Sequence, residues 1–292
     1  MDFRLMSLSL DPQDWLSPHC RRMVNPAGLE FIDIRHPAGE GLVSLFGGQL
    51  LQYTPAGGRP LLWLSDSAVL DGSKAIRGGI PLCWPWFGPA ARGGPQHGLA
   101  RLSRWRLHAL CDTAQGCRLE LELLRPEARL RLLITLDQGL TLELVTTNTG
   151  AGPLPFQAAL HSYFAVDEVD LCAISGLGPT YRDNLAQGAE CRHTAPARAP
   201  FDRVYTRPQP QTRLDRGPDS LLLEHRHQDA LVLWNPHRLP LPEDIDDPRR
   251  FVCIETASLA APPLAPGASR SLLLHCRLVD PHRETAHVSA AG

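Results

Sequence analysis

The centre of the chain alternates apolar and polar residues with a period of two. Leucines alternate with charged residues over 119–123, and apolar residues recur at every second position over 130–136 and again over 140–147. This period is typical of β-strands with one buried face. The Asp137-Gln138-Gly139 sequence between the last two segments is typical of a hairpin turn. The pattern therefore predicts an antiparallel meander through the middle of the chain.

Shorter apolar segments predict further strands outside this meander, whereas stripes of helical period are nearly absent. The expected strands cover 29–35, 50–53, 107–111, 251–255 and 271–277, with a hairpin over 221–234 that turns at Gln228-Asp229. Many short strands separated by Gly and Pro turns are typical of sheets packed on sheets. The sequence thus predicts an all-β fold, a large antiparallel β-sandwich with few short helices.

No repeat and no break in composition divides the chain, so we expect residues 1–292 to form one domain. The segments 195–218 and 260–267 are rich in Pro and Ala and are expected to be surface loops. The polar segment 279–292 is expected to be a flexible tail. We therefore expect the strands of the domain to lie mainly outside these three segments.

Composition excludes several classes of protein. Hydrophobic residues make up 43% of the chain and charged residues 21%, which is typical of a globular protein. The 29 Lys and Arg against 31 Asp and Glu give a net charge of -2, without the basic excess that non-specific nucleic-acid binding requires. Polar residues, Pro or Gly interrupt every apolar run before the about 18 residues of a membrane helix. No secretory signal is evident at the start, and the eight cysteines are scattered, so we expect reduced thiols in the cytoplasm.

The densest unusual segment is KAIRGGIPLCWPWFGP at 74–89, followed by PQHGLAR at 95–101. A Gly pair lets the backbone approach a ligand, and the face of Trp84 matches the apolar face of a sugar ring. Arg77 and Arg101 can each bind an anion through two hydrogen bonds. The alternative is that the aromatic residues cap the core while both arginines pair with carboxylates, and this segment alone favours the alternative.

Three later segments carry a polar residue among apolar ones: ALHSYF with His161, FDRVY with Asp202 and CIETA with Glu255. A histidine in an apolar strand is more often a structural residue than a catalyst. A carboxylate such as Glu255 either pairs with a buried cation or is held, partly desolvated, for proton transfer. Taken one by one, these segments leave both interpretations open.

Taken in order, the segments resemble the aldose 1-epimerase (galactose mutarotase-like) superfamily, and most closely its glucose-6-phosphate 1-epimerase branch. The resemblance rests on KAIRGGIPLCWPWFGP, PQHGLAR, ALHSYF, FDRVY, VLWNP and CIETA. It extends over about 28–277, which is the expected core of the domain. It implies a β-sandwich of the galactose mutarotase type, with a site on the concave face of one sheet and with neither a metal nor an organic cofactor.

The resemblance implies an isomerase of carbohydrate metabolism that interconverts the α and β anomers of hexose 6-phosphates. Among these, glucose 6-phosphate is the expected substrate. Opening the ring requires a base that removes the proton of the C1 hydroxyl and an acid that protonates the ring oxygen. The resemblance assigns Glu255 as the base and His161 as the acid. It follows that no nucleophile or metal is expected in the reaction.

The resemblance also implies the contacts of the substrate. His97 is expected near the ring oxygen and C1, with Gln96 beside it, and Asp202 is expected to hold sugar hydroxyls. Arg77 and Arg101 are assigned to the 6-phosphate. An apolar wall beside the sugar is assigned to Trp84, with Trp86 as the alternative. The expected partner is a small sugar phosphate bound by a monomer, with neither nucleic acid nor membrane.

Some features depart from this pattern or leave other functions open. His237 stands where the resemblance leads us to expect another Trp, and the Pro- and Asp-rich segment 239–247 is expected at the rim. His225 and His227 have the spacing of a metal pair, but a solvated strand is expected because no third ligand is evident. The remaining alternatives are a mutarotase of unphosphorylated aldoses, a sugar-binding module without catalysis, and a glycosidase that uses Glu255 and Asp202.

Overall fold

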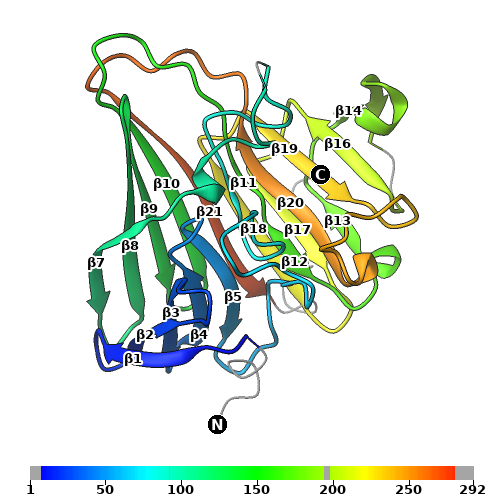
Figure 1. The fold of residues 1–292 in the computed structure, drawn as a ribbon. Helices are drawn as coiled ribbons and strands as arrows, with labels where there is room; N and C mark the ends of the chain where they lie inside the picture. The colour runs from blue at the N-terminus through cyan, green and yellow to red at the C-terminus, as the bar shows by residue number, and fades with distance from the viewer. Residues whose placement is uncertain (1–7, 92, 194–197, 280–292) are drawn as a thin grey trace, which may run out of the picture.

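The computed structural model describes residues 8–91, 93–193 and 198–279. These residues form 21 strands in three antiparallel sheets, joined by loops and by four short 3-10 turns (Figure 1). The predicted all-β class and antiparallel β-sandwich are confirmed. No helix in the described ranges has the length and apolar character needed to cross a membrane.

The first five strands form a meander that we call the N-terminal sheet. Its strands are β1 (Asp11–Trp15), β2 (Cys20–Val24), β3 (Glu30–His36), β4 (Gly39–Ser44) and β5 (Gln49–Pro55). The 3-10 turns are η1 (Ala100–Leu102), η2 (Val169–Leu171), η3 (Asn184–Ala186) and η4 (Pro248–Arg250).

Two eight-membered layers make up the rest of the fold, and we name each after one central strand. The β9 sheet runs in the order β13 (Ala173–Ser175), β17 (Gln211–Asp215), β18 (Ser220–Arg226), β21 (Ser269–Val279), β10 (Leu140–Asn148), β9 (Ala128–Leu136), β8 (Cys117–Arg125) and β7 (Arg106–Asp112). The β20 sheet runs in the order β15 (Ala189–Arg192), β14 (Thr180–Asp183), β16 (Phe201–Tyr205), β19 (Ala230–Asn235), β20 (Phe251–Ser258), β11 (Ala158–Leu160) and β6 (Leu82–Cys83), and β12 (Tyr163–Ala165) also pairs with β20.

The main core lies between the β9 and β20 sheets. Residues of β9 alternate strictly between buried and half-buried, as the sequence pattern predicts. Leu132 on β9 and Leu160 and Ile254 in the facing sheet belong to one buried cluster. Burying each such side chain stabilises the fold by about 1.5–3 kcal/mol. The N-terminal sheet adds Tyr53 to the same cluster, and the Tyr53 hydroxyl donates to the Gly139 carbonyl at 2.9 Å in the β9–β10 turn.

The predicted hairpin over 221–234 is wrong. The two strands exist as β18 and β19, but β18 pairs with β17 and β21 in one sheet while β19 pairs with β16 and β20 in the other. The segment at Gln228-Asp229 therefore carries the chain across the sandwich. A turn between strands of one sheet and a crossing between two sheets have similar local sequences, so the pattern alone did not separate them.

The predicted loop over 195–218 is also wrong in part, since it contains β16 and β17. Both strands are only five residues long, and prolines lie between them, which hid their alternation. Segment 260–267 is a loop as expected, with an isolated bridge from Leu264 to Leu154. Of the expected tail, Val279 is the last residue of β21 and the remaining residues lie outside the described ranges.

Candidate active site

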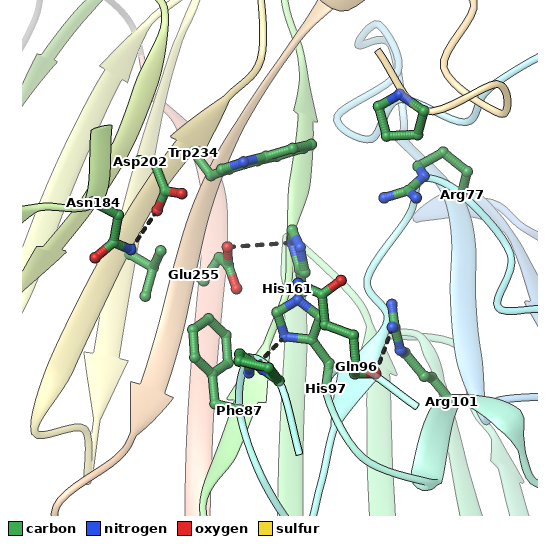
Figure 2. A pocket seen from close by; sticks show the side chains of 14 residues that line it. Arg77, Phe87, Gln96, His97, Arg101, His161, Asn184, Asp202, Trp234 and Glu255 are labelled. Atoms are coloured by element: carbon green, nitrogen blue, oxygen red, sulfur yellow. Dashed lines mark hydrogen bonds and ion pairs between the residues drawn. The ribbon is translucent and has the colours of Figure 1, made fainter. Parts of the chain in front are cut away.

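A pocket opens on the face of the β20 sheet that points away from the sandwich core. It has a volume of about 300 Å³, in the lower range of ligand-binding clefts, which suits one sugar ring. The lining includes seven of the eight substrate and catalytic residues expected from the sequence: Arg77, Gln96, His97, Arg101, His161, Asp202 and Glu255 (Figure 2).

Alternation along three neighbouring strands brings the first polar residues to this face. On β20, Val252 and Ile254 point into the main core, so Glu255 points to the opposite face. Glu255 is opposite Val232 on β19 in the sheet register. Asp202 is opposite Trp234 in the register between β16 and β19. The pleat therefore places a carboxylate, an indole and a second carboxylate on one surface.

A break between two short strands positions His161. β11 pairs with β20 up to Leu160, and pairing with β20 resumes at Tyr163 of β12. His161 lies in this interruption, and its backbone amide donates to the Pro81 carbonyl at 3.0 Å. Nδ1 of His161 is 3.4 Å from Oε1 of Glu255. Two groups from separate segments of the chain thus meet at the centre of the pocket.

Neither member of this pair is satisfied by other protein groups. Glu255 and His161 are 1% and 6% exposed. Glu255 Oε2 and His161 Nδ1 have no hydrogen-bond partner within the described part of the chain. Buried polar atoms without a partner are costly to the fold and are concentrated at functional sites. Their free positions are therefore available to the hydroxyl and ring oxygens of a ligand.

Burial sets the protonation of the pair. Desolvation, with the charge of Asp202 as a second cause, raises the pKa of Glu255 well above its usual value. Desolvation, followed by the neighbouring His97 and by Arg101, lowers the pKa of His161 well below its usual value. Both directions favour a protonated carboxyl group and a neutral imidazole. The uncharged form is therefore the resting form of the pair.

His97 is held as a neutral hydrogen-bond donor below this pair. Its Nδ1 accepts the backbone N–H of Gly88 at 3.2 Å, which leaves the proton on Nε2. Burial, together with the charges of Arg101 and Arg77, lowers the pKa of His97 to about 4. The next residue, Gly98, has φ +80, and a Cβ there would lie 2.1 Å from the Trp84 carbonyl oxygen. Only glycine fits this turn, which fixes the imidazole ring.

Two arginines form a cationic end of the pocket. The Arg77 guanidinium donates from Nε to Asp244 at 3.1 Å and from Nη1 to the Tyr163 hydroxyl at 2.9 Å. Arg101 donates from Nη2 to the Gln96 carbonyl at 2.6 Å, while its buried Nε has no partner among the described residues. Burial lowers the pKa of Arg101, with the charge of Arg77 as an additional cause. Both arginines lie on the same side of the central pair (Figure 2).

The opposite end of the pocket carries hydrogen-bond acceptors. Asp202 accepts from Asn184 Nδ2 at 2.7 Å through Oδ1. Desolvation raises the pKa of Asp202, although the bond from Asn184 acts to lower it. Figure 2 shows Asp202 and Asn184 beyond Glu255, on the side away from the arginines. The pocket is therefore polarised along its length.

Trp84 does not form the wall beside the sugar that the resemblance implies. Trp84 is 4% exposed, contacts Phe156 in the main core and does not line the pocket. The alternative, Trp86, is absent from the lining too, and its Nε1 donates to the Pro95 carbonyl. The wall is instead formed by Trp234, whose ring lies 5.9 Å from that of His161 at a right angle.

Seven lining residues were not among those expected from the sequence: Phe87, Gly88, Pro89, Asn184, Val232, Trp234 and Pro242. Trp234 lies in the VLWNP segment that the resemblance already used, so its position at the end of the apolar Leu-Val-Leu run was an available signal. Asn184 follows Asp183 in the short turn η3 and had no such signal. These residues complete the wall and the acceptor end of the pocket.

The histidines at 225 and 227 do not form the solvated pair that the sequence predicted. His225 is 2% exposed and lies between the two large sheets. Its Nδ1 is 2.8 Å from Thr256 Oγ1 and its Nε2 is 3.2 Å from Thr212 Oγ1. His225 therefore links β18 to β20 across the sandwich. Two other clusters have metal-binding spacing in the described ranges, and both lie outside the pocket: His19, His36 and Asp112, and Glu168, Asp170 and His237.

Comparison with known proteins agrees with the fold and the site. The sequence model of the aldose 1-epimerase family matches residues 30–276, so the chain belongs to the aldose 1-epimerase family. Its class is thus that of isomerases that epimerise aldose sugars, and the resemblance seen in the sequence is confirmed.

Individual relatives are similar over most of their length. A protein of Escherichia coli K12 with the name "Putative glucose-6-phosphate 1-epimerase" is 35% identical over 248 residues, which are 78% of this chain and 83% of that protein. A protein of the same name from Salmonella typhimurium is 34% identical over 256 residues, 80% of this chain and 85% of that protein. A crystal structure described as a "putative mutarotase" from Salmonella typhimurium has a TM-score of 0.86 and 28% identity, and covers 96% of this chain and 100% of that one.

Proposed function

We propose that the protein interconverts the α and β anomers of hexose 6-phosphates, with glucose 6-phosphate as its substrate. The observation that carries this proposal is the order of groups along the pocket. Two arginines lie at one end, the His161–Glu255 pair in the middle and Asp202 at the other end. The names of the E. coli and S. typhimurium relatives support the same substrate.

The covalent structure of a pyranose 6-phosphate has a matching order. The phosphate is attached through C6 to C5, which neighbours the ring oxygen, and the ring oxygen is bonded to C1. A phosphate on Arg77 and Arg101 therefore brings the ring oxygen and the C1 hydroxyl to the His161–Glu255 pair. The hydroxyls beyond C1 then meet Asp202. Because the two reacting oxygens share one carbon, acid and base need to be only a few ångströms apart, as the 3.4 Å contact provides.

Ring opening moves two protons in a balanced way. The reactive form of the pair has its proton moved from Glu255 to His161 across their 3.4 Å contact. Glu255, now a carboxylate, takes the proton of the C1 hydroxyl, and protonated His161 gives its proton to the ring oxygen as the C1–O bond breaks. The products are the open aldehyde, a protonated Glu255 and a neutral His161. Burial favours this uncharged pair, so ring opening returns the two groups to their resting protonation. Rotation about C1–C2 and the reverse transfers then close the ring on the other face of the aldehyde.

The remaining polar groups bind and orient the sugar. His97 donates from Nε2 to the ring oxygen, close to C1, and Asp202 accepts from sugar hydroxyls. The two guanidinium groups bind phosphate oxygens with paired hydrogen bonds, which a net charge of -2 for the whole chain does not prevent because the site is local. Trp234 stacks against the apolar side of the ring. All of these groups come from one chain, which supports action as a monomer, and a sugar phosphate substrate supports a cytoplasmic location.

A substrate panel tests the proposal. Anomer exchange is measured by NMR for glucose 6-phosphate, glucose and galactose, each against the spontaneous rate in buffer. We expect acceleration for glucose 6-phosphate above that for the two free sugars. Arg101→Ala is expected to raise KM for glucose 6-phosphate with kcat little changed, because phosphate contacts act equally in ground and transition states. Equal rates for all three sugars would favour a mutarotase of unphosphorylated aldoses, and sugar binding without exchange would favour a binding module.

A further inference from the structure

The loop between β19 and η4 packs against the cationic end of the pocket. Sequence reasoning placed its Pro- and Asp-rich part at the rim, yet two consecutive residues of it are buried: Asp244 is 7% exposed and Ile245 is 5% exposed. Ile245 belongs to a cluster with Tyr163 and Phe251. Asp246 accepts from Ser65 Oγ at 2.7 Å. The loop is therefore anchored, and it presents a buried carboxylate next to the site.

That carboxylate binds the arginine that faces the pocket. Asp244 Oδ1 accepts from Nε of Arg77 at 3.1 Å, and the Tyr163 hydroxyl accepts from Nη1 at 2.9 Å. Tyr163 is itself buried and stacks on His161 with ring centroids 4.8 Å apart. No hydrogen bond joins Arg77 Nη2 to any residue in the described part of the chain. Two edges of the guanidinium are thus fixed, and one nitrogen is left for a ligand.

We propose that Asp244 is a positioning residue for substrate phosphate: by fixing the Nε edge of Arg77 it aims the Nη2 end at the phosphoryl oxygens and so sets the preference for phosphorylated hexoses. The inference rests on the proposed function, which places the phosphate at Arg77 and Arg101. An arginine side chain has many rotamers, and a planar guanidinium binds phosphate well only in the correct plane. Holding that plane before substrate arrives lowers the entropic cost of binding.

A competing account is that Asp244 only neutralises charge. Arg77 and Arg101 are like charges, and each acts on the electrostatics of the other. A counter-ion would reduce their repulsion but would also weaken the attraction for a phosphate dianion. Removing the charge would then tighten phosphate binding, whereas removing the orientation would weaken it. The two accounts therefore predict opposite signs for the change in KM.

Two substitutions at this position separate the accounts. Asp244→Ala removes both the charge and the hydrogen bond, and we expect KM for glucose 6-phosphate to rise about tenfold with kcat within twofold of wild type. Asp244→Asn removes only the charge, because the amide oxygen still accepts from Arg77 Nε. We expect KM of this variant to return to within about threefold of wild type. For glucose, which carries no phosphate, neither substitution should change KM.

A matched control and a double-mutant cycle complete the experiment. Glu243→Ala removes an exposed carboxylate of the same loop, one residue before Asp244, and it should leave KM unchanged. Combined with Arg77→Ala, Asp244→Ala should add no further loss, because its effect passes through Arg77. Tyr163→Phe removes the other Arg77 partner and should also raise KM, which tests the inference independently if Asp244→Ala does not fold.

The failures are distinguishable. If wild-type protein exchanges glucose 6-phosphate no faster than buffer, the proposed function fails. If wild type is active and Arg77→Ala raises KM, but folded Asp244→Ala keeps the wild-type KM or lowers it, only the positioning role is wrong. An equal rise in KM for glucose would likewise overturn it, since the effect would not act through the phosphate.

Discussion

His161 Nδ1 and Glu255 Oε1 lie 3.4 Å apart on the outer face of the β20 sheet, and Glu255 Oε2 has no hydrogen-bond partner among the described residues. The contact depends on the interruption between β11 and β12, which places His161 beside β20 between the two paired stretches. A shift of one residue in either register would turn one of the two side chains toward the main core. The geometry of the pair is therefore a property of the sheet, and the chemistry that we propose depends on it.

The pair is expected to act as one unit. Replacing His161 with Asn removes the proton donor, and the expected fall in kcat is about 10²-fold or more. Because either loss already prevents the coupled transfer, the double variant with Glu255→Gln should be no slower than the poorer single variant. Steady-state rates of anomer exchange for the four proteins test this. Losses that multiply in the double variant would show that the two groups act independently.

The histidines of the pocket are expected to stay neutral at moderately acid pH. The pKa of His97 is lowered to about 4 by burial, and that of His161 is lowered by burial and by His97. A free histidine titrates near pH 6.5. Imidazole NMR signals of His97 and His161 should therefore not shift between about pH 8 and pH 5.5. A titration midpoint near 6.5 for either ring in the protein without ligand would contradict the electrostatics of the site.

Acid is expected to destabilise the fold partly through His225. Burial lowers the pKa of His225 to about 4 in the folded state, below the 6.5 of an unfolded chain. The unfolded state therefore binds more protons between these values, so stability is lost as pH falls from 6.5 toward 4, by about 3 kcal/mol for this residue.

Substituting His225 tests that assignment. His225→Gln should lower the free energy of unfolding at pH 7, because the bridge to Thr256 is altered. It should also make the pH dependence shallower between pH 4 and 6.5, since one titrating group is gone. Urea unfolding at several pH values measures both quantities. An unchanged slope would mean that His225 is not responsible for the acid loss.

Two tryptophans are expected to respond differently to substitution. Trp234 lines the pocket, so Trp234→Ala should raise KM by roughly tenfold through the lost face for the sugar. Trp84 packs in the core with Phe156, so Trp84→Phe should lower the free energy of unfolding by about 1–3 kcal/mol and leave KM unchanged. Kinetics and thermal unfolding on both variants give the comparison. A KM effect at Trp84 would restore it to the sugar wall.

The fold was predictable where alternation is long. The leucine strands over 117–148 and the Asp137-Gln138-Gly139 turn follow directly from period-two burial. The strands after residue 158 are short, and their partners are distant in sequence, so local pattern did not give their pairing. The chain between β18 and β19 could not be assigned from its sequence. Only the hydrogen-bonded pairing of β18 and β19 with their neighbours shows that the chain passes from one sheet to the other there.

The sequence was enough to predict the central polar residues of the site, but not the aromatic wall or the partners of the arginines. His161 and Glu255 stood out because polar groups interrupt apolar segments, and the motif order joined them. The choice between Trp84 and Trp234 depends on which side of a sheet each faces, and β6, beside Trp84, is only two residues long. The pairing of Arg77 with Asp244 joins two irregular loops, for which periodicity gives no information.

The most direct test is the rate of α-to-β exchange of glucose 6-phosphate at equilibrium, measured by two-dimensional exchange NMR for wild type and for Glu255→Gln. Glutamine matches the shape of the protonated acid, so the variant should keep the thermal stability of wild type. The account predicts exchange well above the buffer rate for wild type and a loss of about 10²-fold or more in the variant. Exchange at the buffer rate for wild type, or undiminished exchange in folded Glu255→Gln, would contradict it.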